Sequence, residues 1–240
     1  MKRMKLTVQI VFLSMMMFIV QGYSCIVDLH HGPKEKEIRK VSGFEAIEVS
    51  HGIDVYLTMG SSELVEVETS EDLLEHLITE VKGKTLKIYF DKSFNWNDET
   101  TVWIQAREIN GINASGGADV IGEDVVETRE LELNASGGSD IKLEVNTGRI
   151  EAEVSGGADI KLSGFTEMLV VNTSGGSDFN SYELTARRAD LEASGGSDIK
   201  VTVEEELDAR ASGGADIYYK GDPTNVNSDS SSGGDVSHRN

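Results

Sequence analysis

The chain has 240 residues, of which 42 are acidic and 22 basic, so its formal net charge is −20. This charge excludes nucleic-acid binding by phosphate neutralisation, because such binding requires a basic surface. An apolar fraction of 38% is enough for a folded core, and with 25 glycines and 2 prolines the chain is neither collagen-like nor broadly disordered. The single cysteine excludes an internal disulfide bond.

Residues 1–24 are predicted to be a signal peptide. Basic residues at positions 2, 3 and 5 precede an apolar run over residues 6–20, which is short for a hydrocarbon core about 30 Å thick. Cys25 follows the small residue Ser24, as at the cleavage point of a bacterial lipobox, although Gly22 stands where leucine is usual. We therefore expect lipidation of Cys25, which would also account for the lone thiol. Cleavage nearby to release a soluble secreted protein is the alternative.

Residues 25–40 are expected to form a polar tether between the lipidated cysteine and the folded domain. The segment contains His30-His31-Gly32-Pro33, followed by a run of Lys and Glu. Two adjacent histidines without further ligands do not make a metal site. We therefore predict no metal here, and the membrane is a partner only through the lipid anchor.

An internal repeat dominates the second half of the chain. The pentapeptide Ser-Gly-Gly-(Ala/Ser)-Asp recurs every 18 to 21 residues, at 115–119, 136–140, 155–159, 174–178, 194–198 and 212–216, and a shortened copy follows at 232–235. Apolar and polar residues alternate strictly around each copy, for example over residues 131–145. An alternation of period two predicts β-strands with one buried and one exposed face.

The repeat predicts a parallel β-helix. One unit of this length cannot bury its apolar face alone, whereas stacked units share a continuous core. The spaced leucines and the Asn position of a leucine-rich repeat are missing, and a propeller blade needs about twice the length. We expect one domain over residues 41–240, with irregular N-terminal rungs at 41–110 and regular repeats at 111–240.

The irregular rungs are predicted from shorter signals. Strands are expected within 44–49, 53–57, 64–67, 86–90 and 102–105, and a short helix at 71–76. The segment His51-Gly52-Ile53-Asp54-Val55 is similar to Gly117-Ala118-Asp119-Val120, which suggests that the solenoid begins early.

Stacking in register would place the repeat aspartates in one outward row, here called the aspartate column: Asp119, Asp140, Asp159, Asp178, Asp198, Asp216 and Asp235. Like charges ~4.8 Å apart repel by about 0.9 kcal/mol per pair in a water-like dielectric. Backbone N–H groups of the corner, which would lower the pKa, could offset this repulsion. So could the lysines two residues on, Lys142, Lys161 and Lys200. Turn capping is the main interpretation; a calcium column and direct ligand binding are the alternatives.

Three segments resemble the head GIN domain family of autotransporter-type adhesins. They are Gly111–Asp119, Phe44–Val49 and Gly52–Val55, together with the repeated Ser-Gly-Gly-x-Asp. The resemblance implies a right-handed β-helix like that of pectin lyases, in lipid-anchored or secreted bacterial envelope proteins with no established catalytic residues.

We therefore expect a non-enzymatic lipoprotein of the cell envelope, in the outer membrane, that presents its β-helix to a glycan or protein ligand. A structural lipoprotein without a ligand is one alternative. A polysaccharide lyase or hydrolase is another, in which Arg187, Arg188 or Arg210 would join Asp178 or Asp198, although a regular row of carboxylates is unlike a catalytic site. The aromatic candidates for ligand contact are Trp96, Trp103, Tyr218 and Tyr219.

Overall fold

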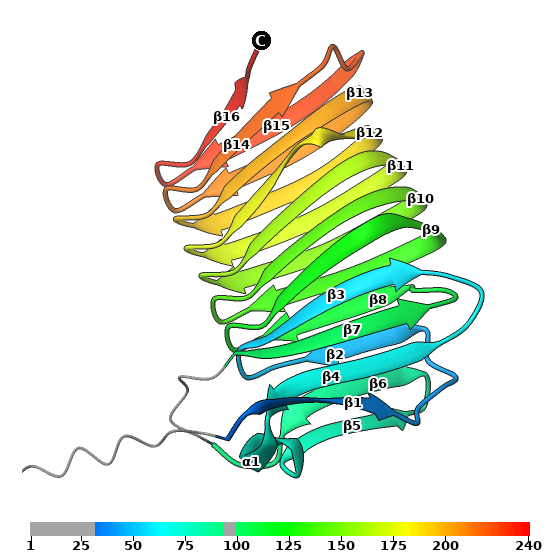
Figure 1. Cartoon of the computed structure of the whole chain (residues 1–240). Coiled ribbons are helices and arrows are strands. Elements are labelled where there is room, and N and C mark those ends of the chain that lie inside the picture. The colour runs from blue at the N-terminus through cyan, green and yellow to red at the C-terminus, as the bar shows by residue number, and fades with distance from the viewer. Residues whose placement is uncertain (1–31, 94–98) are drawn as a thin grey trace, which may run out of the picture. The chain divides into compact units, whose positions relative to one another are not determined.

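The computed structural model describes residues 32–93 and 99–240, which belong to one compact unit. The predicted signal peptide, Cys25, the His30-His31 pair and Trp96 lie outside the described residues. The described part is almost entirely β-structure, with one short helix, α1 (Glu71–Leu74), where a helix was predicted (Figure 1). No helix in this part is long and apolar enough to cross a membrane.

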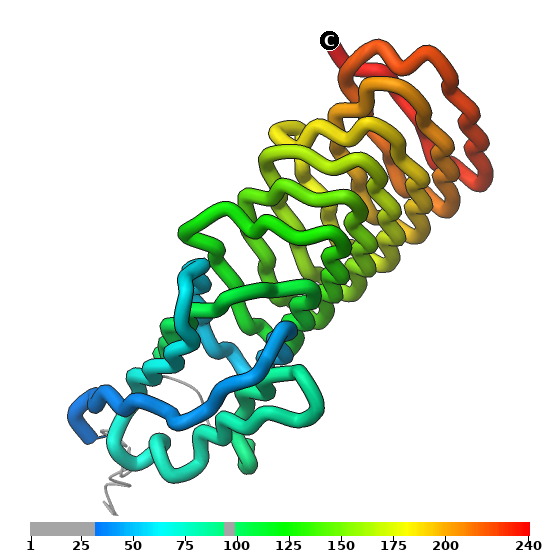
Figure 2. The backbone as a smooth tube through the Cα atoms, turned by 90° about the vertical axis from the view of Figure 1, so that its right-hand side faces the viewer, coloured from blue at the N-terminus to red at the C-terminus, as the bar shows by residue number. Residues whose placement is uncertain are grey.

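The described residues form a β-solenoid of about seven turns, and its C-terminal part is made of regular coils (Figure 2). The expected parallel β-helix is confirmed. The strands of this part pair in parallel from one coil to the next. They are the long strands β9 (Asp119–Ser136), β10 (Asp140–Gly156), β11 (Asp159–Gly175), β12 (Asp178–Gly195) and β13 (Asp198–Ser212), and the shorter strands β14 (Asp216–Lys220), β15 (Asn225–Ser231) and β16 (Asp235–His238).

The N-terminal part mixes parallel and antiparallel pairs. Its strands are β1 (Lys34–Arg39), β2 (Ala46–Val49), β3 (Ile53–Met59), β4 (Leu64–Ser70), β5 (Leu77–Lys82), β6 (Thr85–Phe90), β7 (Thr100–Ala106) and β8 (Gly111–Ser115). Strand β3 lies between β7 and β9, and β2 lies between β6 and β8, in parallel with both neighbours. The pairs β1–β4, β4–β7 and β5–β6 are antiparallel, so the coils end here in hairpin-like edges.

Alternation along each strand builds the core. In β10 the side chains of Ile141, Leu143 and Val145 are buried, whereas Lys142 and Glu144 point outward. β10 and β11 keep one register along their lengths, and the other neighbouring coils return to it after local shifts, so one apolar interior runs through the stack.

Each Ser-Gly-Gly corner needs glycine for two reasons. Gly156 has φ +81°, which disfavours any side chain, and a Cβ there would lie 3.0 Å from the backbone N of Gly137 in the preceding coil. In the six regular corners the residue before the aspartate points inward and is small; Ala158, Ser177 and Ser197, for example, are fully buried. The Ser177 hydroxyl donates to the carbonyl of Val154 at 3.0 Å, so this buried polar group is satisfied.

Three expectations from the sequence need correction. The tether was expected to extend to residue 40, but Lys34–Arg39 forms β1, an edge strand whose charges suit solvent. The final corner is not shortened: Ser231 pairs with Ser212 and Asp235 with Asp216, so the motif begins at Ser231. Ser232 then occupies the first glycine position, with φ +56°. Strand β5 was not predicted.

Candidate functional site

The structure brings the predicted aspartates together. Consecutive members of the aspartate column are direct register partners, from Asp119 paired with Asp140 through to Asp216 paired with Asp235. Asp54 in β3 pairs with Asp119 and is an eighth member that the motif search missed. Its signal was the degenerate copy His51–Val55: Gly52 and Asp54 match the repeat, whereas His51 and Ile53 depart from it.

The surroundings of four of these aspartates disfavour the ionised carboxylate. Partial burial raises the pKa of Asp54, Asp119, Asp140 and Asp159, and a neighbouring carboxylate raises each of them further. Turn capping was expected to lower these pKa values. Backbone hydrogen bonds do reach three of them, Asp119, Asp140 and Asp159, but they come from the aspartate of the next coil and do not outweigh desolvation. The expected direction was therefore wrong for these residues.

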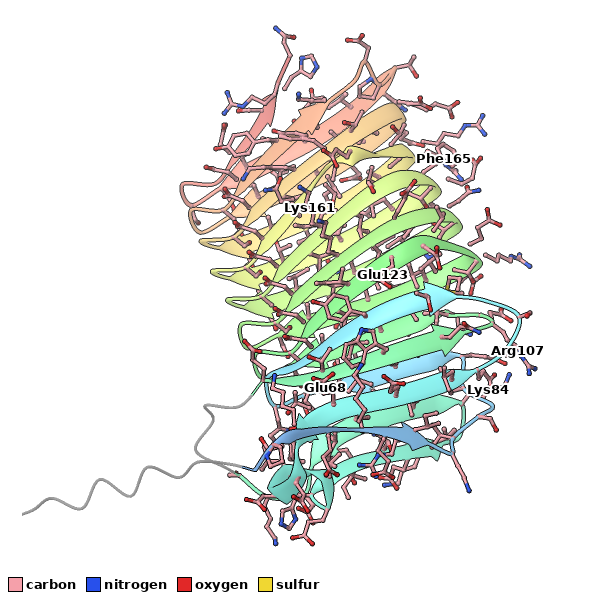
Figure 3. All side chains as sticks on the ribbon, in the orientation of Figure 1. Glu68, Lys84, Arg107, Glu123, Lys161 and Phe165 are labelled. Atoms are coloured by element: carbon pink, nitrogen blue, oxygen red, sulfur yellow. The ribbon has the colours of Figure 1, made fainter. Side chains whose placement is uncertain are left out.

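Lysine side chains neutralise the aspartate column at one position. Among the described residues, the three lysines proposed to balance the column give one ion pair within 4.0 Å, between Lys200 and Asp198 at 3.6 Å. Lys142 and Lys161 are register partners of each other and both are exposed; Lys161 is labelled on the outer face in Figure 3. The column therefore keeps most of its negative charge.

The column does not form a compact metal centre. Across residues 32–93 and 99–240, no group of three or more His, Cys, Asp or Glu side chains is placed to hold a metal ion. Carboxylates in a single row present one oxygen-bearing group per coil, whereas calcium takes six to eight oxygen ligands. The geometry thus gives the calcium alternative no support.

The arginines proposed for an enzymatic site lie elsewhere. Arg187 bridges Glu167 at 3.1 Å and Glu205 at 2.8 Å, and Arg210 contacts Asp190 and Asp208. These are exposed charge ladders between neighbouring coils. They do not bring an arginine to the aspartate column, as the enzymatic alternative required.

The predicted aromatic residues occupy separate places. Trp103 is stacked on Tyr56 with ring centroids 6.4 Å apart, and the Lys36 amine lies 3.9 Å from the Trp103 ring. Tyr218 donates a hydrogen bond to Asp216 at 2.8 Å, and Tyr219 is partly buried against the core. The sequence singled out Trp103, and register adds Tyr56 as its partner.

Residues 43–223 match the family described as "Putative auto-transporter adhesin, head GIN domain". A solved putative adhesin from Bacteroides fragilis is 21% identical, with a TM-score of 0.79 over 86% of this chain and 97% of that one. A putative adhesin from Parabacteroides merdae is 19% identical, with a TM-score of 0.70 over 87% and 97%. A putative lipid binding protein from Parabacteroides distasonis is 22% identical, with a TM-score of 0.69 over 87% and 98%. These likenesses concern the fold. No curated protein matches the sequence significantly.

Proposed function

Since the chain belongs to the family described as "Putative auto-transporter adhesin, head GIN domain", we propose that it is a non-enzymatic interaction module of the cell envelope. In this proposal Cys25 carries the lipid that anchors the protein to the outer membrane, and the β-solenoid is the part that meets a glycan or protein ligand.

One observation carries this proposal: register places outward polar residues of successive coils side by side, in rows that run along the stack. Besides the aspartate column, the second half of each coil gives a row of Asn and Glu, in which Asn134, Glu153 and Asn172 are successive partners. A rigid face with regularly spaced polar groups suits an extended ligand, because little side-chain ordering is required on binding.

The core argues against a ligand inside the solenoid. Its interior is filled by buried side chains such as Ile160, Leu162 and Leu169. Lipid binding, the activity named for the P. distasonis structure, is therefore not part of the proposal.

Adhesion can be tested with cells that carry the full-length chain. Such cells should bind immobilised glycoprotein more strongly than cells without it, and purified residues 32–240 should compete for that binding. Equal adhesion with and without the chain would refute the interaction role.

The anchor is tested separately. Cys25→Ala should move the protein from the membrane fraction to the soluble fraction and abolish labelling by a radioactive fatty acid. Unchanged membrane association and labelling would refute lipidation at Cys25.

A further inference from the structure

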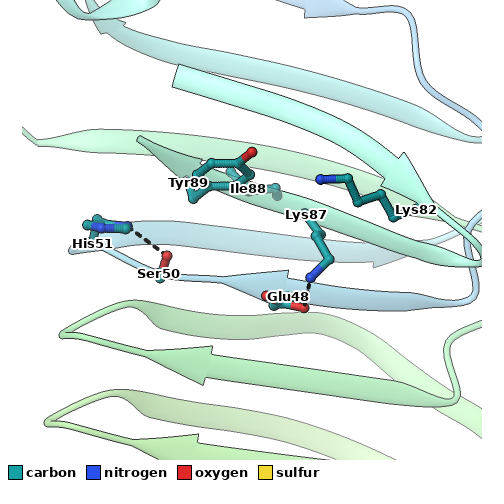
Figure 4. Close-up of a pocket in the computed structure, with 7 residues that line it drawn as sticks. All are labelled: Glu48, Ser50, His51, Lys82, Lys87, Ile88 and Tyr89. Atoms are coloured by element: carbon teal, nitrogen blue, oxygen red, sulfur yellow. Dashed lines mark hydrogen bonds and ion pairs between the residues drawn. The ribbon is translucent and has the colours of Figure 1, made fainter. Parts of the chain in front are cut away.

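A pocket of about 260 Å³ lies beside the first corner of the solenoid (Figure 4), and its residue Glu48 extends the row of Asn and Glu through Asn113. Its side chains come from β2, β5, β6 and the turn after β2. They are Glu48, Ser50, His51, Lys82, Lys87, Ile88 and Tyr89. The sequence search singled out none of them as a binding residue.

The pocket lies at the first copy of the corner in chain order. Asp54 pairs with Asp119, and the N–H of Gly52 donates to the carbonyl of Gly116 at 3.0 Å, so residues 50–54 form the first copy of the corner. In later corners the first glycine packs against the glycine of the coil before it. On the other side of β2 lies β6, and just after β6 the Asp91 N–H donates to the His76 carbonyl at 3.1 Å.

His51 occupies the position that is glycine in the next six corners. Its φ of +68° lies in the left-handed region, which a residue with a Cβ adopts at a cost in free energy. Non-glycine residues held in this conformation cluster at functional sites. The imidazole Nδ1 lies 2.7 Å from the Ser50 hydroxyl, so both side chains are fixed at the edge of the pocket.

The other polar groups are also fixed in place. Glu48 and Lys87 are direct register partners, and their Oε2 and Nζ atoms are 2.6 Å apart. Glu80 accepts a hydrogen bond from the Tyr89 hydroxyl at 2.8 Å and one from the Lys82 amine at 2.6 Å. The Tyr89 ring is thereby immobilised next to a carboxylate, two amines and a hydroxyl.

We propose that this pocket binds a single sugar ring of a neutral glycan. A sugar has vicinal hydroxyls that donate to a carboxylate and accept from an amine, as the Glu48–Lys87 pair would require, and its apolar C–H face can pack on the Tyr89 ring. This inference rests on the proposed interaction role and names its ligand class.

Charge and size support a neutral monosaccharide unit. Lys82 and Lys87 are balanced by Glu80 and Glu48, so the pocket offers no excess positive charge to an anion, and the chain as a whole carries −20. Pockets for drug-sized ligands measure roughly 300–1,000 Å³. A volume of about 260 Å³ therefore fits one ring and not an oligosaccharide, which would have to continue along the outer face.

The test titrates purified residues 32–240 with the methyl glycosides of glucose, galactose, mannose and N-acetylglucosamine and with glucuronic acid, followed by NMR. At least one neutral glycoside should bind at millimolar concentration, with shifts centred on Tyr89. Glu48→Gln and Tyr89→Ala should each weaken binding at least about tenfold, since each removes a charge-assisted hydrogen bond or the stacking surface. Tyr89→Phe, which keeps the ring, should bind more tightly than Tyr89→Ala.

Matched controls are Glu144→Gln and Tyr182→Ala, which make the same changes in β10 and β12, away from the pocket, and should bind as the parent does. Circular dichroism and melting temperature show whether each variant is folded. Binding of no neutral glycoside, preference for glucuronic acid, or equal loss in the controls would overturn the inference. If the adhesion of cells persists under any of those results, the pocket assignment fails while the interaction role stands.

Discussion

Two adjacent glycines in one corner have different structural roles. Gly156 combines a φ of +81° with a close approach to Gly137, whereas Gly157 is not in the left-handed region and has open space where a Cβ would be. The sequence repeats both glycines in every regular corner, so the pattern alone cannot separate them. Only the stacking direction shows which glycine faces the preceding coil.

This difference predicts opposite effects of the same substitution. Gly156→Ala should lower the free energy of unfolding by about 1–2 kcal/mol for the left-handed backbone alone, and by more because the Cβ meets backbone at 3.0 Å. Gly157→Ala should be neutral or stabilise by up to about 1 kcal/mol, because alanine restricts the unfolded chain. Urea unfolding of the two variants measures both values. Equal losses would show that the coils do not touch as described.

At the scale of the element, Asp119 and Asp140 in the aspartate column share one electrostatic property. Burial first, and neighbouring carboxylates second, raise the pKa of Asp119 and Asp140 in the folded state above 3.8. The folded state then holds protons that the unfolded state has released. Stability is therefore highest below the unfolded pKa and falls as the pH rises through the folded pKa.

Mild acid should therefore stabilise the protein. The melting temperature is expected to rise as the pH is lowered from 7 toward about 4, and added salt at pH 7 should act in the same direction by screening the column. Differential scanning calorimetry across this range tests the prediction. A melting temperature that falls steadily on acidification would contradict the assigned direction of the pKa shifts.

Neutral replacements within the column separate its effect from that of the total charge. Asp140→Asn with Asp159→Asn removes two neighbouring charges, and should raise the melting temperature at pH 7 and flatten its dependence on pH. Glu153→Gln removes one charge whose register partners are Asn134 and Asn172, so it should change little. Comparable stabilisation by Glu153→Gln would assign the effect to net charge instead of the column.

The strands and the aspartate column could be predicted from the sequence, because both depend on short patterns that repeat along the chain. Strict alternation identified the strands, and the fixed spacing identified the column, because both follow from period two and from stacking. The sign of the aspartate pKa shifts depended on desolvation in the folded state, which no spacing reveals. The pocket around Tyr89 was missed because Glu48 and Lys87 are 39 residues apart and meet only through the parallel β2–β6 pair.

At the scale of the molecule, the irregular N-terminal part could be predicted least. Strands β1 and β5 carry charged or mixed sequences at edges, and their antiparallel pairing depends on where the regular coils end. The regular coils behave differently, since each strand from β9 to β13 pairs mainly with its immediate neighbours. The free energy of unfolding should then be approximately the sum of a contribution from each coil and a contribution from each contact between adjacent coils.

A coil can accordingly be removed if the register is kept. Deleting residues 140–158 joins Ser139 to Asp159, restores a complete corner, and lets β9 pair with β11 with all buried positions still facing inward. This variant should fold, unfold in one cooperative transition, and show a slightly smaller urea m-value because less surface is exposed.

Deleting residues 140–148 removes half a coil, leaves the corner without its partner strand, and should prevent folding. Circular dichroism and urea titration compare the two. Similar damage by both deletions would mean that the coils are not interchangeable units, and the nearest-neighbour description of this solenoid would be wrong.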